Sequence, residues 1–451
     1  MNRGRRSPTS VLSRAVAAWS ARAYDGKLDA LLDLSGNGLH ARLGSAVGAD
    51  TNDPLRLQFS DGKYVYFPGS ANNSISIPDA ANLSGFTAGI TITVRVRLPD
   101  YTPAANMTFV AKDDTTTREY GFRIITTGEL AAYADPSGTF VGNEVNSTGA
   151  ALVDNTTYWL KASKNLATGL WSFFKAADTG NNVRPTSGWT AIGTAASNAG
   201  TLSSGASPLY IGVINATSNP LAGNVYYVSL NNGVDNAGTD VVVMTPDSAA
   251  EPYASFVCST GQTATFNRSS SGRKLAVVDR DLLLLGTDDY LEVADSPLLN
   301  FGAGQSLTAS LLLRNYSRPS TVALLAKKQS LAAADIGYVI SQDATTEYIE
   351  AGDGASEPFA AGNGYSLGTT ALVAGTRGAD GKLRKYYDEL LSGTSAGSTV
   401  NSLANALALR FGRLSGTGTS YSNYEFFGAA IFREDLSAAN LIRLKGELLA
   451  L

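Results

Sequence analysis

Cysteine and histidine are almost absent from this sequence, and their scarcity excludes several classes of protein. The single cysteine, Cys258, cannot form a disulfide within the chain, so a small secreted domain held together by disulfides is excluded. The single histidine, His40, would have to serve any Ser-His-Asp or Cys-His catalytic site. No recognisable nucleophile motif stands beside His40, so we expect it to be a structural or surface residue.

Charged residues and long apolar runs are also scarce. Charged residues make up 16% of the chain and the formal net charge is -4, so the sequence offers no general basic face for nucleic acid. No apolar run approaches the roughly 20 residues that a membrane-spanning helix needs. We therefore expect neither nucleic-acid binding nor membrane insertion.

Glycine and short β-branched runs are abundant. The chain has 451 residues with 46 glycines and 44% hydrophobic residues, which is the balance of a turn-rich β protein with two to three domains. Alternating runs such as 64–67, 90–98 and 225–228 are bounded by Gly, Asn, Asp or Pro. Many short strands with regular turn signals predict β-sandwiches rather than a parallel α/β sheet.

Much of the chain is written twice, which is the first feature to seek in a sequence of this length. The spacing between matching segments shrinks along the chain, so the copies differ by insertions, which belong on loops. The matches are 33–41 with 267–275, 75–79 with 291–295, Phe86 with Phe301, 92–98 with 307–313, 110–112 with 325–327, 120–124 with 336–340, Gly169 with Gly381, and 210–213 with 410–413.

The two chain ends show helical patterns. Leu12, Val16, Trp19 and Ala23 repeat at helical spacing after Ser10, so we expect a basic, amphipathic N-terminal helix that either packs on the first sandwich or docks on a larger assembly. Arginines interrupt its apolar stretch, so we do not interpret it as an export signal. Near the other end, Ser437 precedes three leucines that share one face, and this pattern predicts a C-terminal helix.

The paired units resemble concanavalin A-like, laminin G-type jelly rolls. The features that carry this resemblance are the Ser/Gly-rich opening, the Ile-Pro-Asp edge at 77–79, the long strand followed by a Lys, and the Gly-bracketed hairpin. It implies an all-β fold of two tandem jelly-roll sandwiches. We expect residues 1–30 to form the helical arm, 31–247 the first jelly roll and 248–451 the second, with a Pro/Asp/Ser/Ala-rich linker at 245–254.

Three stretches resemble more narrowly the LamG-like minor tail proteins of tailed phages that infect actinobacteria: 267–279, 286–290 and 299–301. This resemblance implies a structural virion component at the tail tip, made in the host cytoplasm, with a role in recognising a host cell-wall glycan. We accordingly expect other phage tail proteins as partners, and a homo-oligomer. A carbohydrate-binding module of a bacterial surface or secreted protein is the alternative, and a glycoside hydrolase is the second alternative.

Acidic residues are present, but their spacing is unfavourable for catalysis or metal binding. Hydrolases of concanavalin A-like fold usually carry a Glu-x-Asp-x-x-Glu run, which is absent, and the adjacent pairs Asp288-Asp289 and Asp388-Glu389 point to opposite faces of a strand. We therefore expect no enzyme. Laminin G-type domains often hold calcium, yet Asp113-Asp114, Asp288-Asp289 and the pair Asp50 and Asp53 lack the spacing of a calcium loop, so no cofactor is predicted.

Aromatic residues outside the core are the candidates for glycan binding. Trp159 and Trp171 align with Leu372 and Leu383, so both are expected in the core. Trp189 stands in a Pro/Gly loop where an indole can stack on a sugar, with pinning of its own loop as the alternative. A second candidate cluster is Tyr421 and Tyr424. The candidate assembly residues of the N-terminal arm are Arg5, Arg6, Leu12, Val16 and Trp19.

Overall fold

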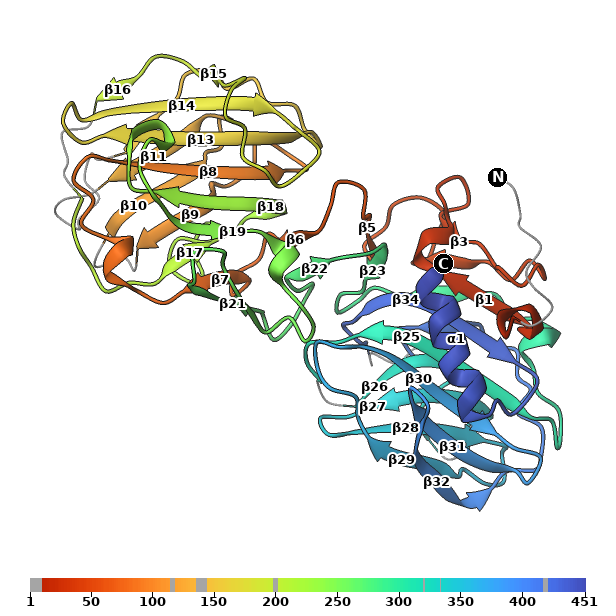
Figure 1. The fold of residues 1–451 in the computed structure, drawn as a ribbon. Coiled ribbons are helices and arrows are strands. Elements are labelled where there is room, and N and C mark those ends of the chain that lie inside the picture. The colour runs from red at the N-terminus through yellow and green to blue at the C-terminus, as the bar shows by residue number, and fades with distance from the viewer. Residues whose placement is uncertain are drawn as a thin grey trace. The chain divides into compact units, whose positions relative to one another are not determined.

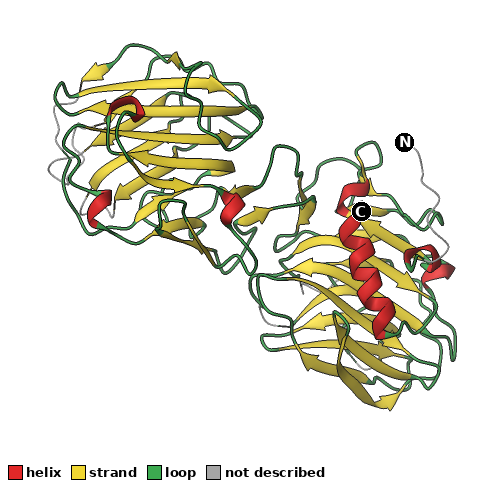
Figure 2. Cartoon of the chain, viewed as in Figure 1, coloured by secondary structure: helices red, strands yellow, loops and turns green. Residues whose placement is uncertain are grey.

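The protein is almost entirely β-structure, as the ribbon and its colouring by secondary structure show (Figures 1 and 2). The computed structural model describes residues 10–113, 118–134, 144–197, 202–318, 321–332, 334–416 and 421–451. Within these residues the only α-helix is α1 (Ala438–Ala450), and none is long and apolar enough to cross a membrane. The predicted all-β class is confirmed.

The chain folds into two compact units, whose boundaries differ from those expected. Unit 1 contains the described part of Met1–Gln58 together with Ser271–Arg273 and Asp281–Leu451. Unit 2 contains Phe59–Ser270 and Lys274–Arg280. Residues 10–58 therefore belong with the C-terminal half of the chain, and the expected linker at 245–254 lies inside unit 2.

Unit 1 is built from two antiparallel sheets. Sheet A has the strand order β32-β31-β30-β25-β34-β23-β5, with β1 also pairing with β34, and sheet B has the order β2-β3-β4-β24-β33-β26-β27-β28-β29. The strands of sheet A are β1 (Ala17–Ser20), β5 (Leu55–Leu57), β23 (Leu282–Leu284), β25 (Leu307–Arg314), β30 (Thr370–Arg377), β31 (Lys382–Tyr387), β32 (Leu390–Ser398) and β34 (Glu425–Phe432). Those of sheet B are β2 (Tyr24–Asp25), β3 (Ala30–Leu31), β4 (Ala41–Leu43), β24 (Leu291–Val293), β26 (Val322–Lys327), β27 (Gly337–Gln342), β28 (Thr346–Gly352), β29 (Phe359–Asn363) and β33 (Leu409–Phe411).

Unit 2 repeats this architecture. Sheet C has the order β15-β14-β13-β8-β18-β6-β22, with β16 pairing with β14 and β19 with β18, and sheet D has the order β12-β11-β10-β9-β17-β7-β21-β20. Sheet C comprises β6 (Tyr64–Pro68), β8 (Gly89–Arg97), β13 (Thr157–Asn165), β14 (Leu170–Ala177), β15 (Thr190–Ala191), β16 (Ala196–Ser197), β18 (Ala222–Asn231), β19 (Asp240–Met244) and β22 (Ala276–Val278). Sheet D comprises β7 (Ser74–Ile77), β9 (Met107–Asp113), β10 (Arg118–Ile124), β11 (Leu130–Ala134), β12 (Glu144–Asn146), β17 (Leu209–Ile211), β20 (Ser255–Val257) and β21 (Thr263–Asn267).

Short 3-10 turns link the strands. They are η1 (Leu12–Arg14), η2 (Ala21–Ala23), η3 (Ala81–Leu83), η4 (Val234–Asn236), η5 (Pro246–Ser248) and η6 (Pro297–Leu299). The predicted hairpin in the first copy is confirmed, since β13 pairs with β14 across a turn in which Gly169 has a φ of 71°. A positive φ is a conformation that glycine adopts without steric cost.

The core of each unit follows from the period-two pattern of its central strand. In β25, Leu307, Ala309, Leu311 and Leu313 all lie in the buried core cluster of unit 1. The equivalent strand β8 carries Ile90, Ile92, Val94 and Val96 at the same spacing, all fully buried. Alternate residues of a strand share one face, so one side of each strand supplies the sandwich interior.

Most of the sequence correspondence is confirmed by strand order, because β7, β8, β9, β10 and β17 occupy the same sheet positions as β24, β25, β26, β27 and β33. The match of 33–41 with 267–275 is wrong. Residues 33–41 lead from β3 into β4, whereas 267–275 connect β21 to β22, one strand later in the same order. Both stretches are Ser/Gly-rich turns, and turn composition alone does not fix the strand that follows.

The predicted N-terminal helix is also wrong within the described residues. Residues 12–14 form a single 3-10 turn, and Ala17–Ser20 form β1, which pairs with β34. All four residues of β1 are buried, so the tertiary sheet pairing overrides a pattern that fits a helix equally well. The C-terminal helix is confirmed, with Ser437 at the N-cap position and Leu441, Leu444 and Leu448 buried.

Candidate functional site

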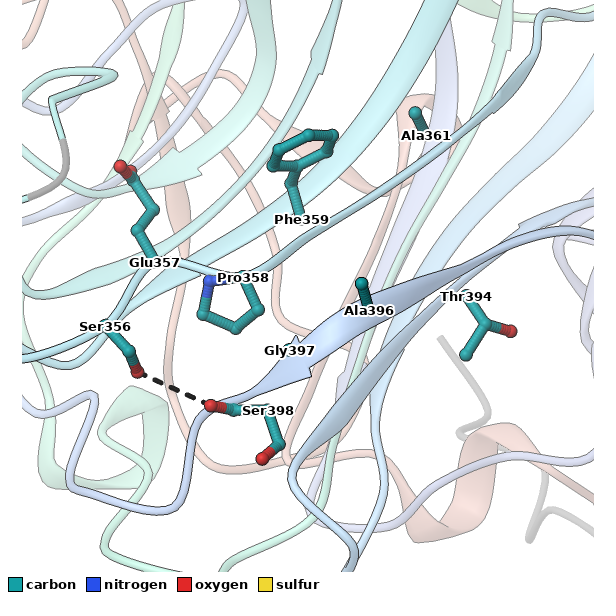
Figure 3. Close-up of a pocket in the computed structure, with 9 residues that line it drawn as sticks. All are labelled: Ser356, Glu357, Pro358, Phe359, Ala361, Thr394, Ala396, Gly397 and Ser398. Carbon is teal, nitrogen blue, oxygen red and sulfur yellow. Dashed lines mark hydrogen bonds between the residues drawn. The ribbon is translucent and has the colours of Figure 1, made fainter.

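A groove of about 510 Å³ lies in unit 1 between the edge strand of sheet B and the edge strand of sheet A (Figure 3). One wall is formed by the approach to β29 and its first residues, and the other by the second half of β32. The lining residues are Ser356, Glu357, Pro358, Phe359, Ala361, Thr394, Ala396, Gly397 and Ser398.

The groove exists because two edge strands touch at one point and separate beyond it. A Cβ atom on Gly362 would collide with Ser392, and one on Gly393 would collide with the backbone of Ala361. These glycines allow β29 and β32 to approach closely, as glycine does where two backbones meet. At the far end Ser356 Oγ donates a hydrogen bond to the carbonyl oxygen of Ser398 at 3.4 Å, so the two walls are joined there as well.

Asp353 ties the two walls together. One of its carboxylate oxygens accepts hydrogen bonds from the backbone N–H groups of Ala355 and Ser356 at 3.0 and 2.7 Å. The other accepts from Thr399 Oγ1, just beyond β32, at 2.7 Å. Burial alone would raise the pKa of Asp353, but the hydrogen bonds from Thr399 and the turn lower it well below its ordinary value.

Phe359 is the prominent apolar residue of the groove. The residue is 56% exposed, which is unusual for a phenylalanine in a strand. One side of the ring contacts Tyr348 edge-on, with 6.1 Å between the ring centroids. Tyr348 is itself held by a hydrogen bond from its hydroxyl to Asp343 at 2.6 Å, and this bond is the main cause that lowers the pKa of Asp343 to about 2. The exposed ring of Phe359 is therefore held on one side by Tyr348.

Charge in the groove is locally neutralised. Glu357 is the one carboxylate of the lining, and it forms an ion pair with the ammonium group of Lys328. The Lys328 side chain is fully buried, and this burial lowers its pKa despite nearby acids. The remaining lining offers an aromatic ring, methyl groups and the hydroxyls of Ser356, Thr394 and Ser398. Such a surface suits an uncharged polyhydroxylated ligand.

Trp189 is placed by the structure in its own loop, in unit 2. Its indole N–H donates to the carbonyl oxygen of Pro185 at 3.0 Å, and its ring packs against the cluster of Trp159, Ala176 and Tyr227. Lys161 Nζ lies 4.3 Å from the ring centroid. The half-buried indole thus pins the loop. Trp159 and Trp171 are fully buried, as predicted for core residues.

The tyrosine cluster is divided by the fold. Tyr424 is buried and its hydroxyl donates to the carbonyl oxygen of Leu324 at 2.9 Å, so the expectation of an exposed ring at this position is wrong. A residue directly preceding β34 continues the alternating pattern of that strand and enters the core. Tyr421 is half-buried, with Arg413 stacked on its ring at 5.1 Å.

The candidate assembly residues of the N-terminus lie mostly in the body of unit 1. Leu12 and Trp19 are buried, Val16 is half-buried, and the Trp19 indole donates to the carbonyl oxygen of Leu39 at 2.6 Å. These side chains are therefore not on a free arm. Arg5 and Arg6 lie outside the described residues. His40 is exposed, and its Nδ1 accepts a hydrogen bond from the backbone of Asp33 at 3.0 Å.

The acidic candidates are engaged within the protein. Asp289 is buried and forms an ion pair with Arg273 at 3.0 Å, and Asp388 pairs with Lys445 at 2.9 Å. Asp50 accepts three hydrogen bonds from Ser45 and Ala46. Asp113 accepts from the Tyr133 hydroxyl at 2.8 Å, whereas Asp114 lies outside the described residues. Among the described residues, no group of three or more His, Cys, Asp or Glu side chains is arranged to hold a metal ion.

Sequence reasoning missed Phe359. The available signal was an aromatic residue directly after Pro358, within a stretch otherwise rich in Gly, Ala and Ser. Such a residue has few apolar neighbours in sequence, and its partner wall on β32 is remote along the chain. The groove could not be located without the pairing of the edge strands.

Comparisons with known proteins find likeness only among solved structures. No family model matches the chain, and no curated protein matches it. A Bacteroides ovatus protein, described as a candidate carbohydrate-binding protein, matches with 15% identity over 47% of this chain and 59% of its own, at a TM-score of 0.33. The match thus spans less than two thirds of that protein.

Two further solved structures are similar to this chain. Domains LG4-5 of the mouse laminin α1 chain match with 11% identity over 86% of this chain and 92% of their own, at a TM-score of 0.30. The CBM40 module of Ruminococcus gnavus IT-sialidase, bound to α2,3-sialyllactose, matches with 10% identity over 40% and 92%, at 0.29. The similar structures are thus laminin G domains and carbohydrate-binding modules, and at these identities the likeness concerns the fold alone.

Proposed function

We propose that this protein binds a neutral glycan without cleaving it, and that it does so as a minor tail protein at the tail tip of a phage. The observation that carries the glycan part is the exposed ring of Phe359 in a groove lined by hydroxyl groups. The apolar face of a pyranose stacks on an aromatic ring, and neighbouring hydroxyls exchange hydrogen bonds with the sugar. The host cell-wall glycan is the proposed ligand.

A binding role is favoured over hydrolysis by the content of the groove. Glycoside hydrolysis needs two carboxyl groups on either side of the scissile bond. The groove lining has one carboxylate, Glu357, and that group is paired with Lys328. The groove therefore has a surface for recognition and lacks the acid and base pair for cleavage.

The phage assignment is supported by the sequence resemblance of 267–279, 286–290 and 299–301 to LamG-like minor tail proteins. In the alternative, the protein is a carbohydrate-binding module of a bacterial surface or secreted protein. The same groove would then bind the glycan, but the protein would not be part of a virion. Antibody labelling of purified virions, viewed by electron microscopy, separates the two. Label at the tail tip supports the phage assignment, and its absence from virions overturns it.

The glycan assignment is tested by binding of cell-wall polysaccharide fragments to Phe359→Ala and Phe359→Trp variants. Stacking contributes about 0.5–1.5 kcal/mol, so the alanine variant is expected to weaken binding by roughly two- to twelvefold, while tryptophan retains it. The matched control is Phe59→Ala, because Phe59 is 40% exposed and lies in unit 2. Equal binding by both alanine variants, or release of reducing ends by the wild type, would contradict the proposal.

A further inference from the structure

Two segments of the chain make the same strand pairings in different units. We call residues 17–57, which contain β1 to β5, the first opening segment, and residues 240–278, which contain β19 to β22, the second opening segment. In the first, β1 pairs with β34, β4 with β24 and β5 with β23. In the second, β19 pairs with β18, β21 with β7 and β22 with β6. The two segments thus occupy equivalent positions.

Each opening segment completes the sandwich of the other repeat. The first is followed in sequence by β6, the first strand of unit 2, but its own strand β5 pairs with β23 (Figure 1). The second is followed by β23 after only residues 279–281, but its strand β22 pairs with β6. The two repeats have therefore exchanged their opening segments within one chain.

Most of the contacts that hold the first opening segment come from the body at 281–451, which any copy of the chain offers, although Arg273, outside that body, donates to the carbonyl oxygen of Asp53 at 2.7 Å. Arg42 forms an ion pair with Glu292 at 2.8 Å across β4 and β24. Just before β1, the carboxylate of Glu447 on α1 accepts hydrogen bonds at 2.8 Å from the backbone N–H groups of Val11 and Leu12. None of these contacts depends on the covalent link from residue 58 to residue 63.

That link has the character of a hinge. Gln58, Phe59 and Ser60 are exposed, and Gly62 has a φ of 92°, a conformation suited to glycine. Exchange of an identical element between protomers is a low-cost route to a dimer, because it reuses contacts that the single chain already makes. We propose that the first opening segment also exchanges between copies, so that residues 17–57 of one chain complete the sandwich of a second chain.

The exchange depends on concentration. A tethered segment competes at an effective concentration in the millimolar range, so dilute protein keeps the segment within its own chain. Copies that fold side by side, at concentrations approaching that range, are expected to trap the segment in a neighbour. This inference concerns assembly and stands independently of the glycan groove.

The test uses two single-cysteine chains in a Cys258→Ser background. Arg42 and Glu292 lie opposite each other in the antiparallel register, and their side chains are 36% and 18% exposed. Directly paired residues of antiparallel strands have Cα atoms about 4.5–5.5 Å apart, within disulfide range. An Arg42→Cys chain and a Glu292→Cys chain are unfolded together at high concentration, refolded and oxidised. A disulfide-linked dimer on a non-reducing gel is the expected result.

Two controls keep the outcome interpretable. The chain with both substitutions must form its cross-link, which shows that the variants fold and that the geometry permits the disulfide. Replacing Arg42→Cys by Lys27→Cys, an exposed position of the same segment outside this register, measures collisional cross-linking. A mixture that yields no more dimer than this control, while the double variant cross-links, would overturn the proposal. Wild-type mass after refolding at low and high concentration gives an independent reading by light scattering.

Discussion

Leu57, the last residue of β5, lies directly opposite Leu282, the first residue of β23, and all of Phe59–Ser270 stands between them in the sequence. The same arrangement recurs in unit 2, where Tyr64 lies opposite Val278. The chain therefore leaves unit 1 after β5 and re-enters it at β23, the strand that pairs with β5. This geometry makes unit 2 an insertion into unit 1 and decides where the chain can be cut.

A fragment of residues 59–280 is expected to fold alone. It contains every strand of sheets C and D, and its two ends are joined by the β6–β22 pairing. A fragment of 31–247, the division expected from the sequence repeat, lacks β20, β21 and β22 and includes strands that belong to unit 1. Thermal unfolding followed by circular dichroism should show a cooperative transition for 59–280 and none for 31–247.

The complementary deletion tests the same geometry from the other side. Replacing residues 59–280 by a two-residue Asn-Gly turn would join β5 to β23 as a hairpin, because these strands are already antiparallel neighbours. The resulting chain should unfold cooperatively as a single sandwich. A cooperative 31–247 fragment together with an unfolded 59–280 fragment would contradict the assignment of the units.

Removing one partner of the buried ion pair between Arg314 and Glu425 is expected to destabilise the protein much more than replacing both partners by apolar residues. Their side chains are 0% and 1% exposed, and Arg314 Nε lies 2.5 Å from the Glu425 carboxylate. Glu425→Ala leaves a buried guanidinium without this carboxylate, and such losses cost about 3–5 kcal/mol in the free energy of unfolding. The double variant Arg314→Met and Glu425→Leu should recover most of that loss in urea unfolding. A double variant no more stable than the single variant would argue against this account.

A lysine occupies an equivalent, buried position in each sandwich. Lys112 Nζ lies 2.9 Å from Asp79 and also pairs with Glu119, while Lys327 Nζ lies 2.7 Å from Asp295 and 2.6 Å from the carbonyl oxygen of Leu407. Lys327→Met keeps the aliphatic volume but removes the donor from these oxygens. We expect a loss of about 1–3 kcal/mol, measured by urea unfolding. Lys27→Met, at an exposed position, is the control and should change stability by less than about 0.5 kcal/mol.

The fold class was predictable from the sequence, and the assignment of strands to units was not. The alternating residues of β8 and β25 identify sandwich strands from local pattern alone. An opening segment, however, carries the same pattern whichever body it completes, so the pattern cannot choose between the two. The helix prediction for the residues of β1 was wrong for a related reason. A strand buried on both faces shows no alternation, and the small residues of β1 also fit a helix.

The candidate site was beyond sequence reasoning for a physical reason. Phe359 is exposed beside the point where Gly362 and Gly393 bring two edge strands together, and Gly393 is remote in sequence. Trp189 and Tyr424 were better candidates by composition, but exposure is a property of the tertiary structure. The indole of Trp189 donates a hydrogen bond to the carbonyl oxygen of Pro185, and the hydroxyl of Tyr424 donates one to the carbonyl oxygen of Leu324, so both side chains turn inward.

Lowering the pH should weaken the hydrogen bonds by which the Asp353 carboxylate joins the two walls of the groove. The folded-state pKa of Asp353 lies below its ordinary value of 3.8. A carboxylate with a depressed pKa contributes stability that is fully present above the unfolded pKa and is lost as the pH falls toward the folded pKa. Thermal stability of unit 1 and glycan affinity should therefore decline together as the pH drops below about 4.

The Asp353→Asn variant tests this account. The substitution removes the charge and one acceptor, so the stability of the variant should be lower by about 1–3 kcal/mol near neutral pH and should respond less to acid. The control is Asp288→Asn at an exposed position of unit 1, which should keep the acid response of the wild type. If Asp353→Asn and the wild type lose stability in parallel over this range, Asp353 is not the group that fastens the two walls.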